Sequence, residues 1–169
     1  MRKRERKPTD KWHLDEMNIK IKGETFILWR AVGSEGHELE VLLQKRRNKK
    51  SAIRFLSRLL DNYPVPRFIV TDKLRSYIKT IKLICPKTVH RTHTRLNNRV
   101  ENAHQPTSRK EKVLIKFKHH NSAQCTLSLI GKVRNIFAVR YTKTAPEQRI
   151  VFESAKDIWD EATQRLFAA

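Results

Sequence analysis

The chain has 169 residues, 38% of them hydrophobic, which is enough for one globular domain with a real core and too little for two. It carries 37 Lys or Arg against 17 Asp or Glu, and this formal net charge of +20 favours a polyanionic partner, nucleic acid above all. No apolar run approaches the roughly 18 residues of a membrane span and no secretory signal is present, so we expect a cytoplasmic protein without a membrane partner.

Residues 1–10 are expected to form a basic N-terminal arm, followed by a single domain over residues 11–169. The arm begins MRKRERK, with five basic residues, one acid and no apolar periodicity. This pattern is typical of a flexible segment that contacts phosphates or is simply solvated.

Three strands are predicted next, over residues 12–23, 25–32 and 39–45. In the first, Met17, Ile19 and Ile21 alternate with polar residues, which is the period of a strand. Short turns join the three strands, the second through a loop that contains glycine, so they should form an antiparallel meander.

The period then changes to that of a helix within residues 45–64, with Ser51 as a possible N-cap and Pro64 beyond the end. The nearly all-apolar run PRFIVTD suits a central strand buried on both faces, and it ends at Asp72. A helix over residues 73–84 and a short fifth strand over 87–92 follow.

Further helices are predicted from about Arg99 to Pro106, over residues 122–139 and, with an acidic composition, over residues 154–167. Antiparallel strands followed by crossover units imply an α/β fold, a mixed five-stranded sheet with helices on both faces. This is the order of a ribonuclease-H-like fold.

The two cysteines, Cys85 and Cys125, lie forty positions apart and favour a reducing compartment over a disulfide scaffold. We expect both to be small buried side chains. Cys85 precedes His90 and His93, but a structural zinc site needs a fourth ligand that this stretch lacks, so no zinc is expected.

Three carboxylates are candidates for a metal site. Asp15 lies on the first predicted strand, Asp72 at the end of the fourth, and Glu101 at the start of the helix after the fifth. Glu101 is the single acid among ten basic residues between Lys73 and Lys110. Three converging carboxylates can hold two Mg²⁺ or Mn²⁺ ions against a phosphodiester, stabilising the attacking and leaving oxygens of an in-line displacement. Taken singly, each also fits a structural role: a solvated strand residue, an N-cap, or an acid in a first helical turn.

Several short sequence blocks resemble those of DDE transposases from small bacterial insertion sequences, particularly the insertion sequence six family. The blocks, in the family's order, are WHLDEM, RAVG, KRRNKKSAIRFL, IVTDK, the pair His90–Arg91, and NNRVEN. The likeness runs from about Lys7 to Ala162. Three differences are Gly33, where RAVD is usual, the twenty-eight residues between Asp72 and Glu101, which are fewer than is common in the wider family, and the short start, since the family usually has a helix-turn-helix region before this domain.

The resemblance implies that Asp15, Asp72 and Glu101 are the catalytic, metal-binding triad. It also implies an enzyme that cleaves and transfers DNA strands with two Mg²⁺ or Mn²⁺ ions, working as a homodimer or larger assembly at the bacterial nucleoid. Water would first release a 3′ hydroxyl, which would then attack a target phosphate.

Polar and basic residues near the triad are expected to contact DNA. They are Lys73, Arg75, Arg95, Asn97, Asn98, Arg99, His104, Arg109, Lys110 and Lys112. The basic run KRRNKK at 45–50 is expected to contact phosphates as well, or to be a solvated helix entry.

Four alternatives remain open at this point. The chain could be a truncated, non-catalytic DNA-binding remnant or a regulator of transposition, which the short start favours. It could also be a metal nuclease of the same fold that cuts branched DNA or RNA hybrids, or a ribosomal-type RNA binder. A tyrosine recombinase, with Tyr141 near Arg134 and Arg140, is the fourth.

Overall fold

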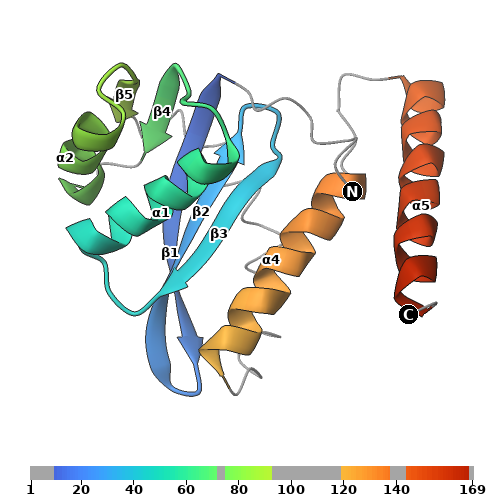
Figure 1. Cartoon of the computed structure of the whole chain (residues 1–169), viewed down its shortest axis with the longest axis horizontal. Coiled ribbons are helices and arrows are strands. Elements are labelled where there is room, and N and C mark those ends of the chain that lie inside the picture. Colours follow the sequence, from blue (N-terminus) through green and yellow to red (C-terminus); the bar gives the residue numbers. More distant parts are fainter. Residues whose placement is uncertain (1–9, 72–74, 93–118, 138–143, 168–169) are drawn as a thin grey trace.

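A computed structural model of the chain describes residues 10–71, 75–92, 119–137 and 144–167. Its helices and strands are shown in Figure 1: β1 (Lys11–Ile21), β2 (Glu24–Gly33), β3 (Glu38–Gln44), α1 (Lys49–Asn62), β4 (Phe68–Thr71), α2 (Arg75–Ile84), β5 (Val89–Thr92), α4 (His120–Phe137) and α5 (Ala145–Phe167). Residues 1–9 of the expected basic arm and the helix expected from Arg99 to Pro106 lie outside the described residues.

The five strands form one mixed sheet in the order β3-β2-β1-β4-β5. The pairs β1–β2 and β2–β3 are antiparallel, whereas β1–β4 and β4–β5 are parallel. This confirms the predicted meander followed by crossover units. It also places β1 at the centre of the sheet, beside β4.

The β1–β2 hairpin turns on two residues, Lys22 and Gly23. Both have positive φ, at 52° and 84°, which is the backbone of a type I′ turn. This turn matches the right-handed twist of the strands, and it fixes the register in which Ile21 pairs with Glu24.

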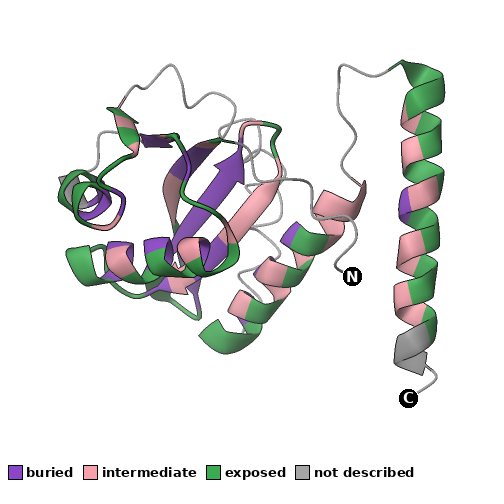
Figure 2. Ribbon diagram, turned by 45° about the horizontal axis from the view of Figure 1, so that its top comes forward, coloured by how far each residue is buried: buried purple, intermediate pink, exposed green. Residues whose placement is uncertain are grey.

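The larger core lies between the sheet and helices α1 and α2. These helices cover one face of the sheet, and the strands beneath them are the most buried part of the molecule (Figure 2). Members of this core include Trp12, Leu14, Trp29, Phe55, Leu56, Ile69, Tyr77 and Cys85. Cys85 is therefore the small buried side chain that was predicted.

The smaller core lies on the opposite face, under α4. Ala123 and Leu127 of α4 pack there against Ile19, Ile21, Phe26, Leu28 and Val41. Cys125 falls between the two contact positions and points away, so it is exposed. The prediction that Cys125 is buried was wrong, because residues two positions apart on a helix do not share a face.

Helix α4 also covers the outer edge of β3 with two side-chain amides. Gln124 accepts from the Leu43 N–H at 2.6 Å and donates to the Val41 carbonyl at 2.8 Å. Asn135 accepts from the Glu38 N–H at 3.0 Å and donates to its carbonyl at 2.6 Å. These amides bond the backbone groups that an edge strand otherwise leaves open to pairing with another chain.

Helix α1 begins differently from the prediction. The N-cap is Asn48, whose side-chain oxygen accepts from the Ser51 N–H at 2.9 Å, so the prediction of Ser51 as the cap was wrong. Both residue types cap well, and the helix simply starts one turn earlier.

Helix α5 begins nine residues before its predicted start. Thr144 and Glu147 close its first turn, with the Thr144 N–H and hydroxyl donating to Glu147 Oε2 at 2.8 and 3.0 Å. The helix lies beside α4, on the side away from the sheet (Figure 1), and its Phe152 and Trp159 contact Phe137 at the end of α4. Within the described segments, none of the helices combines the length and hydrophobicity of a membrane span.

Candidate active site

Asp15 lies in β1, the central strand. Successive strand residues point to opposite faces, so Asp15 is on the same face as Ile19 and Ile21, the face of α4. Its side chain is half-buried. A partly accessible carboxylate is a hard oxygen donor of the kind that Mg²⁺ and Mn²⁺ take.

The parallel pairing of β1 with β4 brings the end of β4 to Asp15. Leu14 pairs with Thr71, the last residue of β4. Asp72 follows Thr71 in the sequence and lies outside the described residues. The neighbouring-strand part of the prediction is thus confirmed, while the meeting of the two carboxylates remains a prediction.

A buried ion pair lies on the same face as Asp15, one and two strands away. Arg30, directly opposite Asp15 in the β1–β2 register, has its Nε 3.1 Å from Glu38 Oε2. The two side chains are 4% and 11% exposed. The sequence reasoning missed both residues, although a charged residue within the apolar run TFILWRAV is a signal for a buried pair.

A second ion pair, between a buried carboxylate and an exposed arginine, lies on the opposite face, next to Asp15 in the sequence. The side chain of Glu16 is 2% exposed and pairs with the Nε of Arg47. Burial raises the pKa of Glu16, and Arg47 and Tyr77 partly offset that rise. Burial is also the main reason why the pKa of Tyr77 is raised well above its usual value.

His90 of β5 lies close to the end of β4. Its Nε2 is 2.8 Å from the Thr71 hydroxyl, one residue before Asp72 in the sequence. Burial lowers the pKa of His90, which favours the neutral ring. The contact therefore helps to fix the strand end that precedes Asp72.

Most of the predicted site residues lie outside the part of the chain that the structure describes. They are Asp72, Lys73, Arg95, Asn97, Asn98, Arg99, Glu101, His104, Arg109, Lys110 and Lys112. Arg75 opens α2, but its side chain is not described. Among the described residues, no three His, Cys, Asp or Glu side chains are grouped so that they could hold a metal ion.

The basic run at 45–50 is divided between internal contacts and solvent. Lys45 pairs with Glu24 at 2.9 Å, and Arg47 pairs with Glu16. The other basic side chains of the run, Arg46, Lys49 and Lys50, are exposed. The run is therefore partly structural, and phosphate contact remains a prediction for these three residues.

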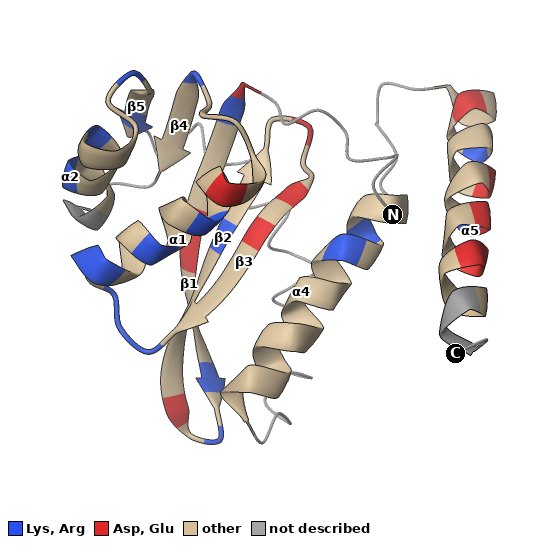
Figure 3. Cartoon of the chain, in the orientation of Figure 1, with Lys and Arg blue, Asp and Glu red and all other residues tan. Residues whose placement is uncertain are grey.

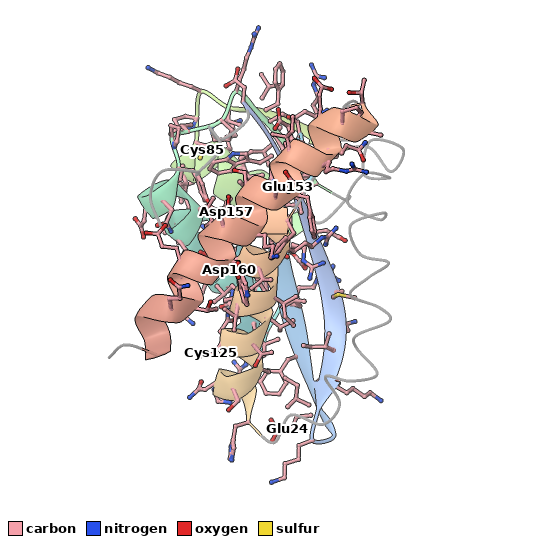
Figure 4. All side chains as sticks on the ribbon, turned by 90° about the vertical axis from the view of Figure 1, so that its right-hand side faces the viewer. Glu24, Cys85, Cys125, Glu153, Asp157 and Asp160 are labelled. Atoms are coloured by element: carbon pink, nitrogen blue, oxygen red, sulfur yellow. The ribbon has the colours of Figure 1, made fainter. Side chains whose placement is uncertain are left out.

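Charge is unevenly distributed over the described elements. Basic residues mark the approach to α1 and the face of α2, whereas α5 carries most of its charge as acid (Figure 3). Glu153, Asp157 and Asp160 lie along α5, well away from Glu24 at the tip of the β1–β2 hairpin (Figure 4). The acidic helix packs on α4 through its aromatic side chains.

Comparison with known proteins shows which family the chain belongs to. A family model described as a DDE domain matches residues 9–140. Two similar curated proteins of Staphylococcus aureus are the transposase for insertion sequence-like element IS431mec of strain Mu50 and the transposase for insertion sequence element IS257 in transposon Tn4003. Each is 37% identical over 111 residues, covering 62% of this chain and 49% of the relative, so the chain spans about half the length of these relatives.

A solved structure shows the same fold. The catalytic core domain of HTLV-2 integrase, in a dimeric form complexed with magnesium, matches with a TM-score of 0.63 and 18% identity. The match covers 82% of this chain and 94% of that one. At such identity the likeness concerns the fold alone, and it confirms the predicted ribonuclease-H-like architecture.

Proposed function

Because the chain belongs to the DDE-domain family of transposases, of the type found in insertion sequence six elements, we propose that it cleaves DNA at insertion-sequence ends and joins them to a target. Its catalytic residues in this proposal are Asp15, Asp72 and Glu101. The observation that carries the proposal is the family match over residues 9–140, a range that contains all three carboxylates.

The sheet register supports a pairing of Asp15 with Asp72. Parallel strands keep paired residues on the same face, and the pairs Trp12–Ile69, His13–Val70 and Leu14–Thr71 run without a shift. One further step in the same register would bring Asp72 opposite Asp15, with both carboxylates on one face. Glu101 is proposed as the third member from the sequence alone.

The donor set suits a hard divalent cation. Three carboxylates offer oxygen ligands of the kind that Mg²⁺ and Mn²⁺ prefer, and the described member, Asp15, is partly accessible. Two ions bound by such carboxylates would polarise the phosphate and activate the attacking oxygen.

The proposed reaction consists of two in-line displacements at phosphorus. Water attacks the phosphodiester at the element end, and the bond to the 3′ oxygen breaks to release a 3′ hydroxyl. That hydroxyl then attacks a phosphodiester of the target and displaces the leaving oxygen of that same phosphodiester. The protein forms no covalent bond to DNA, so its side chains bind and position the reactants.

Basic and amide side chains near the triad would neutralise phosphates and orient the DNA backbone. We assign this role to Lys73, Arg75, Arg95, Asn97, Asn98, Arg99, His104, Arg109, Lys110 and Lys112. The excess of positive charge over the whole chain supports such a partner.

We further propose that residues 1–10 form a basic arm and that residues 11–169 form the catalytic domain with its C-terminal helices. Joining paired ends requires two sites, so the active form would be a homodimer or a larger assembly. It would act in the bacterial cytoplasm, at the nucleoid.

A supercoiled-plasmid nicking and strand-transfer assay with Mg²⁺ tests the proposal. Asp15→Asn should reduce the rate about a thousandfold, since loss of a metal ligand removes several kcal/mol of transition-state stabilisation. Asp61→Asn is the matched control, because Asp61 is exposed on α1, a helix that carries no member of the triad.

Activity that survives Asp15→Asn would rule out the proposed triad. A wild-type chain that binds DNA but neither nicks nor joins it with Mg²⁺ or Mn²⁺ would also contradict the proposal, and would agree instead with a non-catalytic remnant.

A further inference from the structure

Phe68, the first residue of β4, contacts two arginine side chains to which the proposal above gives no role. The guanidinium carbon of Arg91, in β5, lies 4.4 Å from the centroid of the ring, and that of Arg67 lies 5.2 Å from it. Both distances are within the range of a cation–π contact. One aromatic ring thus holds two positive charges from two different segments.

The register of the sheet places this ring on the face that carries Asp15. In the β1–β4 pairing Phe68 lies beside Lys11, four residues before Asp15. In the β4–β5 pairing Arg91 lies beside Val70. Paired residues of parallel strands share a face, and so do residues two or four positions apart on one strand. Phe68 and Arg91 therefore lie on the same face as Asp15.

The half of this face formed by β4 and β5 is open, whereas the other half is covered. Helix α4 packs on residues of β1, β2 and β3. Val89 of β5, which pairs with Phe68, is 48% exposed, and Arg67 and Arg91 are exposed as well. Basic residues mark the start of β4 and β5 itself at this edge of the sheet (Figure 3). Both arginines are therefore accessible to a partner that approaches the face of Asp15.

Two like charges beside one ring repel each other, and no carboxylate of the described segments forms an ion pair with either of them. The arginines that form ion pairs there are Arg30, Arg47 and Arg58. The Asp10 carboxylate accepts from the backbone N–H of Arg67 at 3.3 Å. An anion that contacts both guanidinium groups would replace their mutual repulsion with attraction.

The stacked arrangement suits a phosphate. Contact with a ring uses the flat face of a guanidinium, and its N–H donors lie in the plane of the group, where they remain available. These donors match two oxygens of one phosphate. The ring also restricts side chains that would otherwise lose conformational freedom on binding. Phe68 therefore orders the two arginines in advance for an anion of this shape.

From this geometry we propose that Arg67 and Arg91, held by Phe68, form a phosphate clamp for double-stranded DNA beside the catalytic centre. The choice of DNA as the source of the phosphate rests on the function proposed above and on the net charge of +20. A strand rises roughly 3.3 Å per residue, so four residues of β1 separate the clamp from Asp15 by about 13 Å. At about 3.4 Å per base pair, the clamp would contact the backbone about four base pairs from the cleaved phosphate.

The test is fluorescence anisotropy of the full chain with a labelled DNA duplex, without metal and over a series of salt concentrations. Arg67→Gln and Arg91→Gln should each weaken DNA binding about five- to tenfold at about 0.1 M salt, because each removes the neutralisation of one phosphate. The slope of log K against log salt should become shallower by about one in each variant.

Phe68→Leu separates an ordered pair of arginines from a general effect of charge. It keeps both charges and a large apolar side chain, but it removes the ring. DNA binding should weaken about threefold, the size of an exposed cation–π contact. The salt slope should stay that of the wild type, because the number of neutralised phosphates does not change.

Arg149→Gln is the matched control. Arg149 is an exposed arginine on the acidic helix α5, so this variant loses the same charge from an element that does not suit DNA. Its DNA affinity and salt slope should stay close to those of the wild type. Urea unfolding, run on every variant, separates a change in stability from a change in DNA affinity.

The outcomes distinguish this inference from the proposed function. If Arg67→Gln and Arg91→Gln bind DNA as Arg149→Gln does, the clamp is wrong, whereas nicking that depends on Asp15 would leave the proposed function standing. If the wild type binds DNA through both arginines but neither nicks nor joins it, the proposed function is wrong and the clamp stands. Wild-type DNA affinity in Phe68→Leu would contradict the role of the ring.

Discussion

Two ion pairs lie on opposite faces of the sheet: the buried Glu16 carboxylate pairs with the exposed Arg47, and Arg30 pairs with Glu38, both of them largely buried. A paired buried charge adds little net stability, but removing one partner leaves a costly unpaired charge. Both pairs adjoin Asp15, one along the chain and one across the sheet. At the residue scale, the surroundings of Asp15 are therefore fixed by directional polar contacts rather than by apolar packing alone.

His90 should make folding stability depend on pH. Burial lowers its pKa below the usual 6.5, so the unfolded chain takes up a proton first as the pH falls. The stability contributed by the neutral ring is present above about pH 6.5, the unfolded value, and is lost as the pH falls toward the folded pKa. Urea unfolding at pH 7.5 and pH 5.0 should show that His90→Gln loses less stability on acidification than the wild type does.

The control for this prediction is His119→Gln, at an exposed histidine before α4. In this variant the difference in the free energy of unfolding between pH 7.5 and pH 5.0 should stay close to that of the wild type. An unchanged difference in His90→Gln would show that burial of this ring does not contribute to the acid response.

At the element scale, α4 is attached to the sheet chiefly through β3. Its Gln124 and Asn135 amides bond the β3 backbone, and Gly131 lies over the side chain of Glu38. A Cβ at position 131 would lie 1.6 Å from Glu38 Oε1, well inside any possible contact. The glycine is thus what allows the Arg30–Glu38 pair to sit beneath the helix.

Gly131→Ala should destabilise the fold by about 1–3 kcal/mol, the usual cost of overpacking. The sign of this change in stability is informative, because alanine in place of glycine inside a helix otherwise stabilises the fold by roughly 1 kcal/mol. The change is measured as the difference in the free energy of unfolding in urea between Gly131→Ala and the wild type. Lys132→Ala, one position along on the exposed side of α4, should change that free energy little.

A double-mutant comparison locates the cause. In a Glu38→Ala background the added methyl has nothing to displace, so Gly131→Ala should there be neutral or stabilising. Equal costs in both backgrounds would show that Glu38 is not the group that excludes a side chain at position 131.

Most elements could be predicted from the sequence because their apolar periodicity is strong. The strand order followed from the same pattern, since sequential antiparallel strands and crossover helices leave few arrangements. The start of α5 was missed because residues 145–153 have a weaker apolar stripe, although Thr144 and Glu147 form the spacing of a capping box.

The two ion pairs could not be predicted, because each joins residues from different elements, as Glu16 and Arg47 show. Periodicity assigns a residue to a face of a strand, but it does not say which side chain from another element meets it there. Asp15 was placed correctly on the first strand, since that strand and its neighbour follow from local patterns, and the structure puts this strand at the centre of the sheet. The meeting of Asp15 with Asp72 and Glu101 stays a prediction.

At the scale of the whole molecule, some of the positive charge lies where it lowers the stability of the fold. Helix α1 has no acidic residue in its first turn and carries Lys49 and Lys50 there instead. Cations at a helix N-terminus are unfavourable, because the unpaired N–H groups already make that end positive. Such an arrangement is relieved when a polyanion approaches, which is consistent with the proposed DNA partner.

Lys50→Glu should therefore change stability and DNA binding in opposite directions. The free energy of unfolding should rise by about 0.3–1 kcal/mol, because an acid suits the start of α1. DNA affinity should fall, and the slope of log K against log salt should become shallower by about one for each phosphate that the variant no longer neutralises. Urea unfolding and a fluorescence-anisotropy salt series measure the two effects.

Lys82→Glu makes the same change of charge in the last turn of α2, where a basic residue suits the helix. This control should lower stability, the opposite of the effect at Lys50. If DNA binding responds to net charge alone, the two variants should lose affinity equally. A larger loss in Lys50→Glu, in the variant that folds more stably, would place the start of α1 against the DNA, because weaker folding could not then explain the weaker binding.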